Sequence, residues 1–178
     1  MKYCLTADAP VAFDFVLLPY RGDDPPPVGA ERLEVREGNA VVPRGRATAL
    51  KLRGTKREDC YYLSHGAPAL RAFGGVTTDA QLAWIRTQGS PLPIRFLVKG
   101  GTRLATGQKV LFSSSGAING LDVTYRKDQV EVSASGAEAV VNVTLWAPNV
   151  KRLLVNGVGA RFRWVGSEIR FSLGRARQ

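Results

Sequence analysis

A single histidine in a chain of 178 residues limits the acid–base chemistry that this sequence could perform. His65 follows Tyr61 and Tyr62 at the end of a predicted strand, where its imidazole could meet solvent or a ligand. A tyrosine and a histidine held close together can abstract and return a proton, and β-elimination next to a uronate carboxylate requires both of these steps. The alternative, which we favour, is that His65 is an ordinary residue at a strand end.

Other catalytic and metal-binding patterns are not found in the sequence. One histidine cannot build a His-rich zinc site, and Cys4 and Cys60 lack zinc-finger spacing, so two buried free thiols are favoured over a disulfide. No serine has the Gly-x-Ser-x-Gly context of an exposed nucleophile, and residues 113–116 are expected to form a turn. The glycine pairs at 74–75 and 100–101 lack the lysine of a phosphate-binding loop and indicate tight turns. We expect no metal, no cofactor and no catalytic set.

Trp146 is the first candidate for binding rather than catalysis. In the run that ends at Leu145, alternation places Trp146 on the same nominally polar side as Asn142 and Thr144. The flat apolar face of an exposed indole matches the C–H face of a pyranose ring, so Trp146 could carry a sugar. Strand-end tryptophans also cap the cores of sandwiches, and that interpretation is favoured.

Three arginines form a second candidate for binding. Arg161 and Arg163 alternate with Phe162 and Trp164, which predicts that both guanidinium groups point outward while the aromatic pair is buried, and Arg170 projects likewise from the next strand. Guanidinium pairs with carboxylate or sulfate through two parallel hydrogen bonds, a geometry that lysine cannot reproduce. The pattern suits an acidic polysaccharide; the alternative is a solvated face.

Hydrophobic alternation predicts the architecture that positions these residues. Residues 121–126 and 129–134 alternate apolar and polar side chains around a short turn, which indicates a β-hairpin. Further strands are predicted within or around residues 11–18, 33–42, 48–53, 60–64, 80–86, 94–98, 141–145, 153–155, 162–164 and 169–173. The sequence therefore predicts an all-β fold, an antiparallel two-sheet β-sandwich of about a dozen strands. It forms a single domain over residues 1–178, with a Pro-rich connection at 23–27.

Composition and charge restrict the classes of partner. No apolar run approaches the roughly 20 residues of a membrane helix, and no secretory signal is visible. The formal charge of +10 is uneven: residues 1–40 carry −3, whereas residues 44–57 hold six bases and no acid, and residues 151–178 hold seven bases against Glu168. Positive surface attracts polyanions in general. Nucleic acid ranks below carbohydrate because the chain has no RNA-binding aromatic signature, helix-turn-helix pattern or zinc finger.

Several short segments follow one another in the sequence: Phe15 to Tyr20 before a Pro-rich connection, Thr78-Asp79-Ala80, Gly100 to Leu104, Leu145 to Pro148 and Val155-Asn156-Gly157. In this order they resemble the C-terminal β-sandwich of heparinase II/III-type polysaccharide lyases. The resemblance implies a partner α/α-toroid, on a longer chain or a neighbouring gene, that supplies most catalytic residues. It also implies a periplasmic or extracellular setting. The family's sandwich can hold a structural zinc and donate a histidine, but His65 matches no such motif.

These observations lead to one principal hypothesis and three alternatives. The principal hypothesis is a non-catalytic accessory sandwich that supports or binds a uronate-containing polysaccharide. The alternatives are a complete small polysaccharide lyase that uses Tyr61 or Tyr62 with His65, a basic nucleic-acid-binding domain, and a structural domain that docks on a partner or a second copy through Val11 to Leu18. The oligomeric state and the identity of the polysaccharide are left open.

Overall fold

Two nine-stranded sheets face each other in the computed structural model, which describes residue 16 and residues 27–90, 92–135 and 140–174. The described residues contain no helix. Cys4, the predicted strand at 11–18 apart from Val16, and the Pro-rich connection apart from Pro27 lie outside the described residues.

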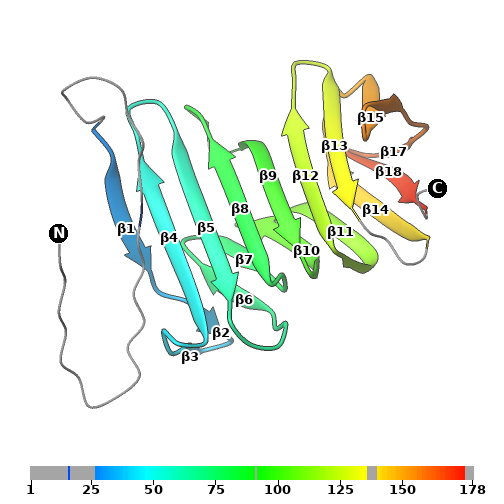
Figure 1. Cartoon of the computed structure of the whole chain (residues 1–178). Helices are drawn as coiled ribbons and strands as arrows, with labels where there is room; N and C mark the ends of the chain where they lie inside the picture. The colour runs from blue at the N-terminus through cyan, green and yellow to red at the C-terminus, as the bar shows by residue number, and fades with distance from the viewer. Residues whose placement is uncertain (1–15, 17–26, 91, 136–139, 175–178) are drawn as a thin grey trace, which may run out of the picture.

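The sheets are called the first and the second sheet, and in Figure 1 the first lies in front. In spatial order, the first sheet consists of β1 (Gly29–Leu33), β4 (Ala47–Arg53), β5 (Glu58–Ser64), β8 (Leu82–Thr87), β9 (Pro93–Lys99), β12 (Gly120–Tyr125), β13 (Gln129–Ser135), β15 (Arg152–Val155) and β16 (Val158–Gly159). The second consists of β17 (Arg163–Val165), β18 (Glu168–Leu173), β14 (Val141–Trp146), β11 (Lys109–Ile118), β10 (Gly101–Thr106), β7 (Val76–Thr78), β6 (Arg71–Phe73), β2 (Arg36–Glu37) and β3 (Ala40–Val41).

The predicted all-β sandwich is confirmed, with three corrections. The described residues form eighteen strands rather than about a dozen: several strands of two or three residues are too short for alternation to reveal, and the longer β10 and β11 were also missed. One strand pair is parallel: β13 and β15 are separated in the chain by β14, which belongs to the other sheet. Residues 113–116 are not a turn but lie inside β11, where Ser113 pairs with both β10 and β14.

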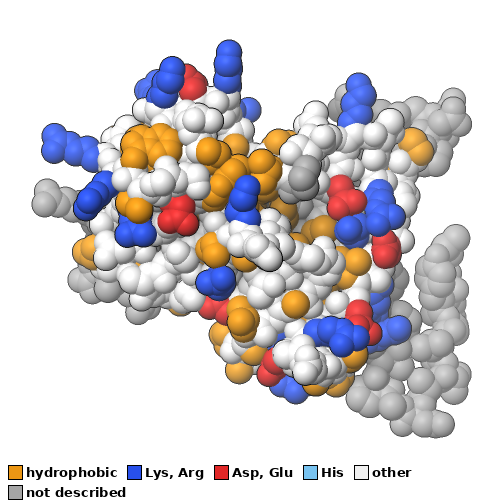
Figure 2. All heavy atoms as spheres, turned by 180° about the vertical axis from the view of Figure 1, so that it is seen from behind, with side chains coloured by type: hydrophobic (Ala, Val, Ile, Leu, Met, Phe, Trp, Pro, Cys, Tyr) orange, Lys and Arg blue, Asp and Glu red, His pale blue; other side chains and the backbone are white. Residues whose placement is uncertain are grey.

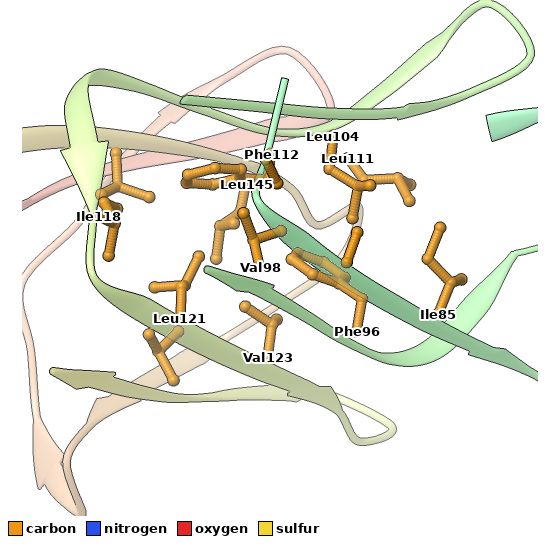
Figure 3. Close-up of a cluster of buried hydrophobic side chains, with 14 of the residues drawn as sticks. Ile85, Phe96, Val98, Leu104, Leu111, Phe112, Ile118, Leu121, Val123 and Leu145 are labelled. Atoms are coloured by element: carbon orange, nitrogen blue, oxygen red, sulfur yellow. The ribbon is translucent and has the colours of Figure 1, made fainter. Parts of the chain in front are cut away.

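The core lies between the sheets, as the period of two requires. In Figure 3, Phe96 and Val123 from the first sheet lie near Phe112 and Leu145 from the second, and all four side chains have 0% exposure. Since the inward side chains of both sheets fill this layer, a ligand or partner can only meet the outward side chains and the sheet edges.

Tight turns join the strands at the positions where glycine was predicted to do so. Gly100 (φ +66°) links β9 to β10, and a Cβ on Gly101 would lie 2.6 Å from the Cα of Ala80, so only glycine fits there. Asn156 (φ 51°) and Gly157 (φ 80°) form the two-residue turn between β15 and β16.

Candidate functional site

A row of polar side chains crosses the outward side of the second sheet. Strand register aligns Arg163 of β17 with Arg170 of β18, then Thr144 of β14, Ser113 of β11 and Arg103 of β10. Neighbouring strands are about 4.8 Å apart, so this arginine row spans roughly 19 Å. It has guanidinium groups at both ends and hydroxyl groups between them.

At the Arg103 end of the arginine row, hydrogen bonds from the neighbouring strand β7 and from the residue after it fix the backbone. The hydroxyl of Thr78 donates to the carbonyl of Arg103 (2.7 Å), and the carboxylate of Asp79 accepts from the backbone N–H of Arg103 (2.8 Å) and of Thr102 (2.9 Å). These hydrogen bonds satisfy backbone N–H and C=O groups at the start of β10 and fix the position of the Arg103 backbone in the sheet.

Side-chain hydrogen bonds also tie together three strands beside the arginine row. The hydroxyl of Ser172 donates to the side-chain oxygen of Asn142 (2.9 Å), and the backbone N–H of Asn142 donates to the hydroxyl of Ser115 (3.0 Å). Because these bonds connect β18, β14 and β11, the polar surface near the row is a cross-linked part of the sheet.

The arginines of the candidate site are exposed and form few interactions with other side chains. Arg161 precedes β17, and it, Arg163 and Arg170 are all exposed. Arg170 approaches Glu168 at 3.9 Å with its side chain 56% exposed, a geometry that contributes little energy. Within the described part of the chain, neither Arg161 nor Arg163 forms an ion pair. Figure 2 views the molecule from this side, and lysine and arginine side chains project across it.

Trp146 packs as the end of the core rather than as an open platform. Its half-buried ring lies 6.5 Å from that of Tyr125, whose hydroxyl donates to the carbonyl of Trp146 (2.7 Å). The ammonium of Lys109 sits 4.1 Å from the centre of the indole, which occupies one ring face with a cation–π contact. A sugar could stack on that face only if Lys109 moved.

The expectation that Phe162 and Trp164 form a buried pair is wrong for Trp164, which is 42% exposed. Trp164 pairs with the fully buried Ile169 on β18. However, β17 is the last strand of the sheet, so the core covers the inner side of β17 only partly. The rings of Phe162 and Trp164 meet edge to face at 5.8 Å. Trp164 is therefore an exposed indole on the inner side of the edge strand, on the opposite side from Arg163, and alternation alone could not reveal its exposure.

The candidate catalytic residues lie on and just beyond β5, with the two tyrosines on opposite sides of the strand. Tyr62 points inward with 2% exposure and accepts a hydrogen bond from Arg71 (3.1 Å), while Tyr61 points outward, as alternation along β5 requires. His65 is exposed beyond the end of β5, and its backbone N–H donates to the carbonyl of Arg46. Burial, and then the charge of Asp59, raise the pKa of Tyr61, which disfavours the phenolate that would abstract a proton.

Other chemistry finds little support in the described residues. They contain no group of three or more His, Cys, Asp or Glu side chains arranged to hold a metal ion. No helix among them is long and apolar enough to cross a membrane. Cys60 is a buried free thiol, and burial raises its pKa, which makes it a poor nucleophile.

Comparison with known proteins leaves the family open. No model of a protein family matches the chain, and no curated protein matches it. The arginine row, with the exposed Arg161 just before β17, is therefore a candidate site that rests on its own geometry.

Proposed function

We propose that this chain is a non-catalytic accessory β-sandwich that binds an acidic, uronate-containing polysaccharide on the outward side of the second sheet. The observation that carries the proposal is the arginine row, which aligns Arg163, Arg170 and Arg103 with the hydroxyl groups of Thr144 and Ser113.

The chemistry of the row suits a chain of acidic sugars. Guanidinium groups donate two parallel hydrogen bonds to a carboxylate or sulfate, and hydroxyl side chains both donate to and accept from sugar hydroxyls. An open row on a sheet is also accessible to the middle of a long polymer, which a closed pocket is not.

The proposal that the domain is non-catalytic draws support from the position of the tyrosines. Tyr62 lies in the core and Tyr61 faces outward from the opposite sheet to the arginine row. The resemblance to the sandwich of heparinase II/III-type lyases would make this chain the accessory part of such an enzyme, with the toroid on a longer chain or a neighbouring gene. That assignment is part of the proposal.

Retention on columns of immobilised heparin and alginate tests the proposal. The test variant carries Arg161→Gln, Arg163→Gln and Arg170→Gln, and we expect it to elute at lower salt than the unmodified chain. Unmodified protein should pass through a column of neutral dextran without delay, because the row recognises acidic groups.

A matched control separates the site from overall charge. Arg44, Arg46 and Arg152 are also exposed, and they lie on β15 of the first sheet or in the turn before β4. Changing these three to Gln removes the same number of charges, so it should reduce retention much less. If both triple variants lose retention equally, binding follows net charge alone and the arginine row is not the site.

A further inference from the structure

The sequence contains two Asn-Gly pairs that can undergo the same covalent reaction, and the structure holds them differently. They are Asn119-Gly120, between β11 and β12, and Asn156-Gly157, in the turn between β15 and β16. In such a pair the backbone nitrogen of the glycine can attack the side-chain carbonyl carbon of the asparagine. Glycine favours this step because it has no side chain to shield the nitrogen and its backbone is free to adopt the conformation that ring closure needs.

The side chain of Asn156 is held by two hydrogen bonds. Its Oδ1 accepts from the backbone N–H of Ala134 (2.8 Å), and its Nδ2 donates to the carbonyl of Ala134 (3.1 Å). The backbone N–H of Asn156 also donates to the carbonyl of Val132 (2.8 Å), so this residue continues the parallel pairing of β13 with β15. Both polar atoms of the amide group are therefore engaged with β13, which keeps the group away from Gly157.

The side chain of Asn119 has no such restraint. It is exposed, and it forms no hydrogen bond with the part of the chain that the structure describes. Gly120 begins β12 and pairs with Ser135, the last residue of β13. The backbone N–H of Gly120 therefore lies at the end of a ladder, where pairs open most easily. The amide of Asn119 can reach this nitrogen while the rest of the sheet stays folded.

We propose that Asn119 is a site of spontaneous deamidation in the folded chain, whereas Asn156 is protected by its hydrogen bonds to Ala134. The nitrogen of Gly120 forms a bond with the Cγ of Asn119, and the bond between Cγ and Nδ2 breaks. The Nδ2 group takes the proton that the Gly120 nitrogen gives up and leaves as ammonia, so a cyclic imide remains. One water molecule opens the imide at either of its carbonyl groups and yields an aspartyl or an isoaspartyl residue; no oxidant or reductant is needed.

The isoaspartyl product adds a carbon atom to the main chain at a corner that has little room. Ile118 and Leu121, which have 0% and 1% exposure, point into the core on either side of this corner, as Figure 3 shows. A Cβ on Gly120 would lie 2.7 Å from the Oγ of Ser135. The longer main chain should therefore weaken the fit of β12 against β13, and the isoaspartyl form should unfold at lower urea than Asn119→Asp, which has the same charge and a normal main chain.

Peptide mapping of the aged protein tests the proposal, with Asn156 as an internal control. Trypsin cleaves after lysine and arginine, so residues 110–126 and residues 153–161 form separate peptides with one asparagine each. The unmodified folded chain is kept at mildly alkaline pH, and mass spectrometry follows the conversion of each amide to an acid. We expect Asn119 to react about tenfold faster or more, because two hydrogen bonds of ordinary net strength must break before Asn156 can react.

Two controls show whether the difference belongs to the fold. In concentrated urea both asparagines should react at similar rates, because the hydrogen bonds to Ala134 are lost. Asn119→Ser cannot form the imide and should abolish the acidic form that accumulates in the folded chain. Equal rates for the two peptides in the folded chain, or a faster reaction at Asn156, would overturn the proposal. It would also be overturned if neither peptide reacted in the folded chain while both reacted in urea.

Discussion

Replacing the buried Arg71 by methionine should destabilise the fold by leaving the hydroxyl of Tyr62 unpaired in the core. The side chain of Arg71 is 1% exposed and donates to the hydroxyls of Ser64 (2.7 Å) and Tyr62 (3.1 Å) and to Glu37 (3.1 Å). Burial alone would lower the pKa of this guanidinium, but its bonds to Tyr62 and Glu37 outweigh that effect and raise it. Arg71 therefore stays charged and joins the two sheets.

The expected cost follows from which partners are buried. Tyr62 is 2% exposed, and a buried polar group that loses its partner costs about 1–3 kcal/mol. Ser64 keeps its hydrogen bonds with the backbone of Gly66 (3.3 and 3.4 Å), and Glu37 has a side chain that is 45% exposed and can return to water, so both add little. Methionine retains most of the apolar stem, and we therefore expect a loss of about 1–3 kcal/mol, or roughly 3–10 °C in Tm for a chain of this size.

Urea denaturation of a double-mutant cycle measures this coupling. Arg71→Met and Tyr62→Phe are made singly and together; Phe keeps the ring that stacks on Phe73 at 4.8 Å. The double variant should be more stable than the sum of the single losses predicts, by about 1 kcal/mol or more. A loss below about 1 kcal/mol for Arg71→Met, or strictly additive losses, would refute the reasoning.

Three further predictions concern binding, catalysis and pH. Affinity for heparin should fall as salt rises, and the Arg161, Arg163 and Arg170 triple variant should depend less on salt, as filter binding at several salt concentrations can measure; equal salt dependence would count against the site. The purified chain should produce no ultraviolet absorbance of unsaturated uronate from heparin, hyaluronan or alginate; turnover that disappears in His65→Ala would establish the lyase alternative instead. Burial raises the pKa of the Tyr125 hydroxyl above its ordinary value of 10.0, so the unfolded chain loses this proton at a lower pH than the folded chain does. The contribution of this group to stability is therefore complete below that ordinary pKa and should decline as the pH rises above it. Urea titrations between about pH 8 and 11 should show a shallower decline for Tyr125→Phe, and an unchanged decline would contradict this assignment.

Most of the longer strands were predictable where one face is buried, although β10 and β11 were missed. The hairpin at 121–134 corresponds to β12 and β13, because burial of Val123 and Val132 enforces the alternation. Alternation and the turn between the two strands also predicted that Arg163 and Arg170 face the same side. The structure pairs these two residues directly, which alternation did not specify.

What the sequence left undetermined depends on contacts between distant strands. The polar residues at 113–116 suggested a turn, but β10 and β14 pair with this segment from both sides. Thr144 and Arg103 joined the arginine row through register that no local pattern specifies. The exposure of Trp164 depends on the place of β17 at the sheet edge, which is a property of the topology.

Titration of the isotopically labelled chain with an acidic oligosaccharide, followed through its backbone amide NMR signals, tests the central claim most directly. We predict that the shifted signals belong to β10, β11, β14, β17 and β18, strongest around Arg103, Thr144 and Arg170, and that a neutral oligosaccharide shifts none of them. Shifts confined to the first sheet, or no shifts with the acidic sugar at low salt, would contradict the proposal that the arginine row binds an acidic polysaccharide.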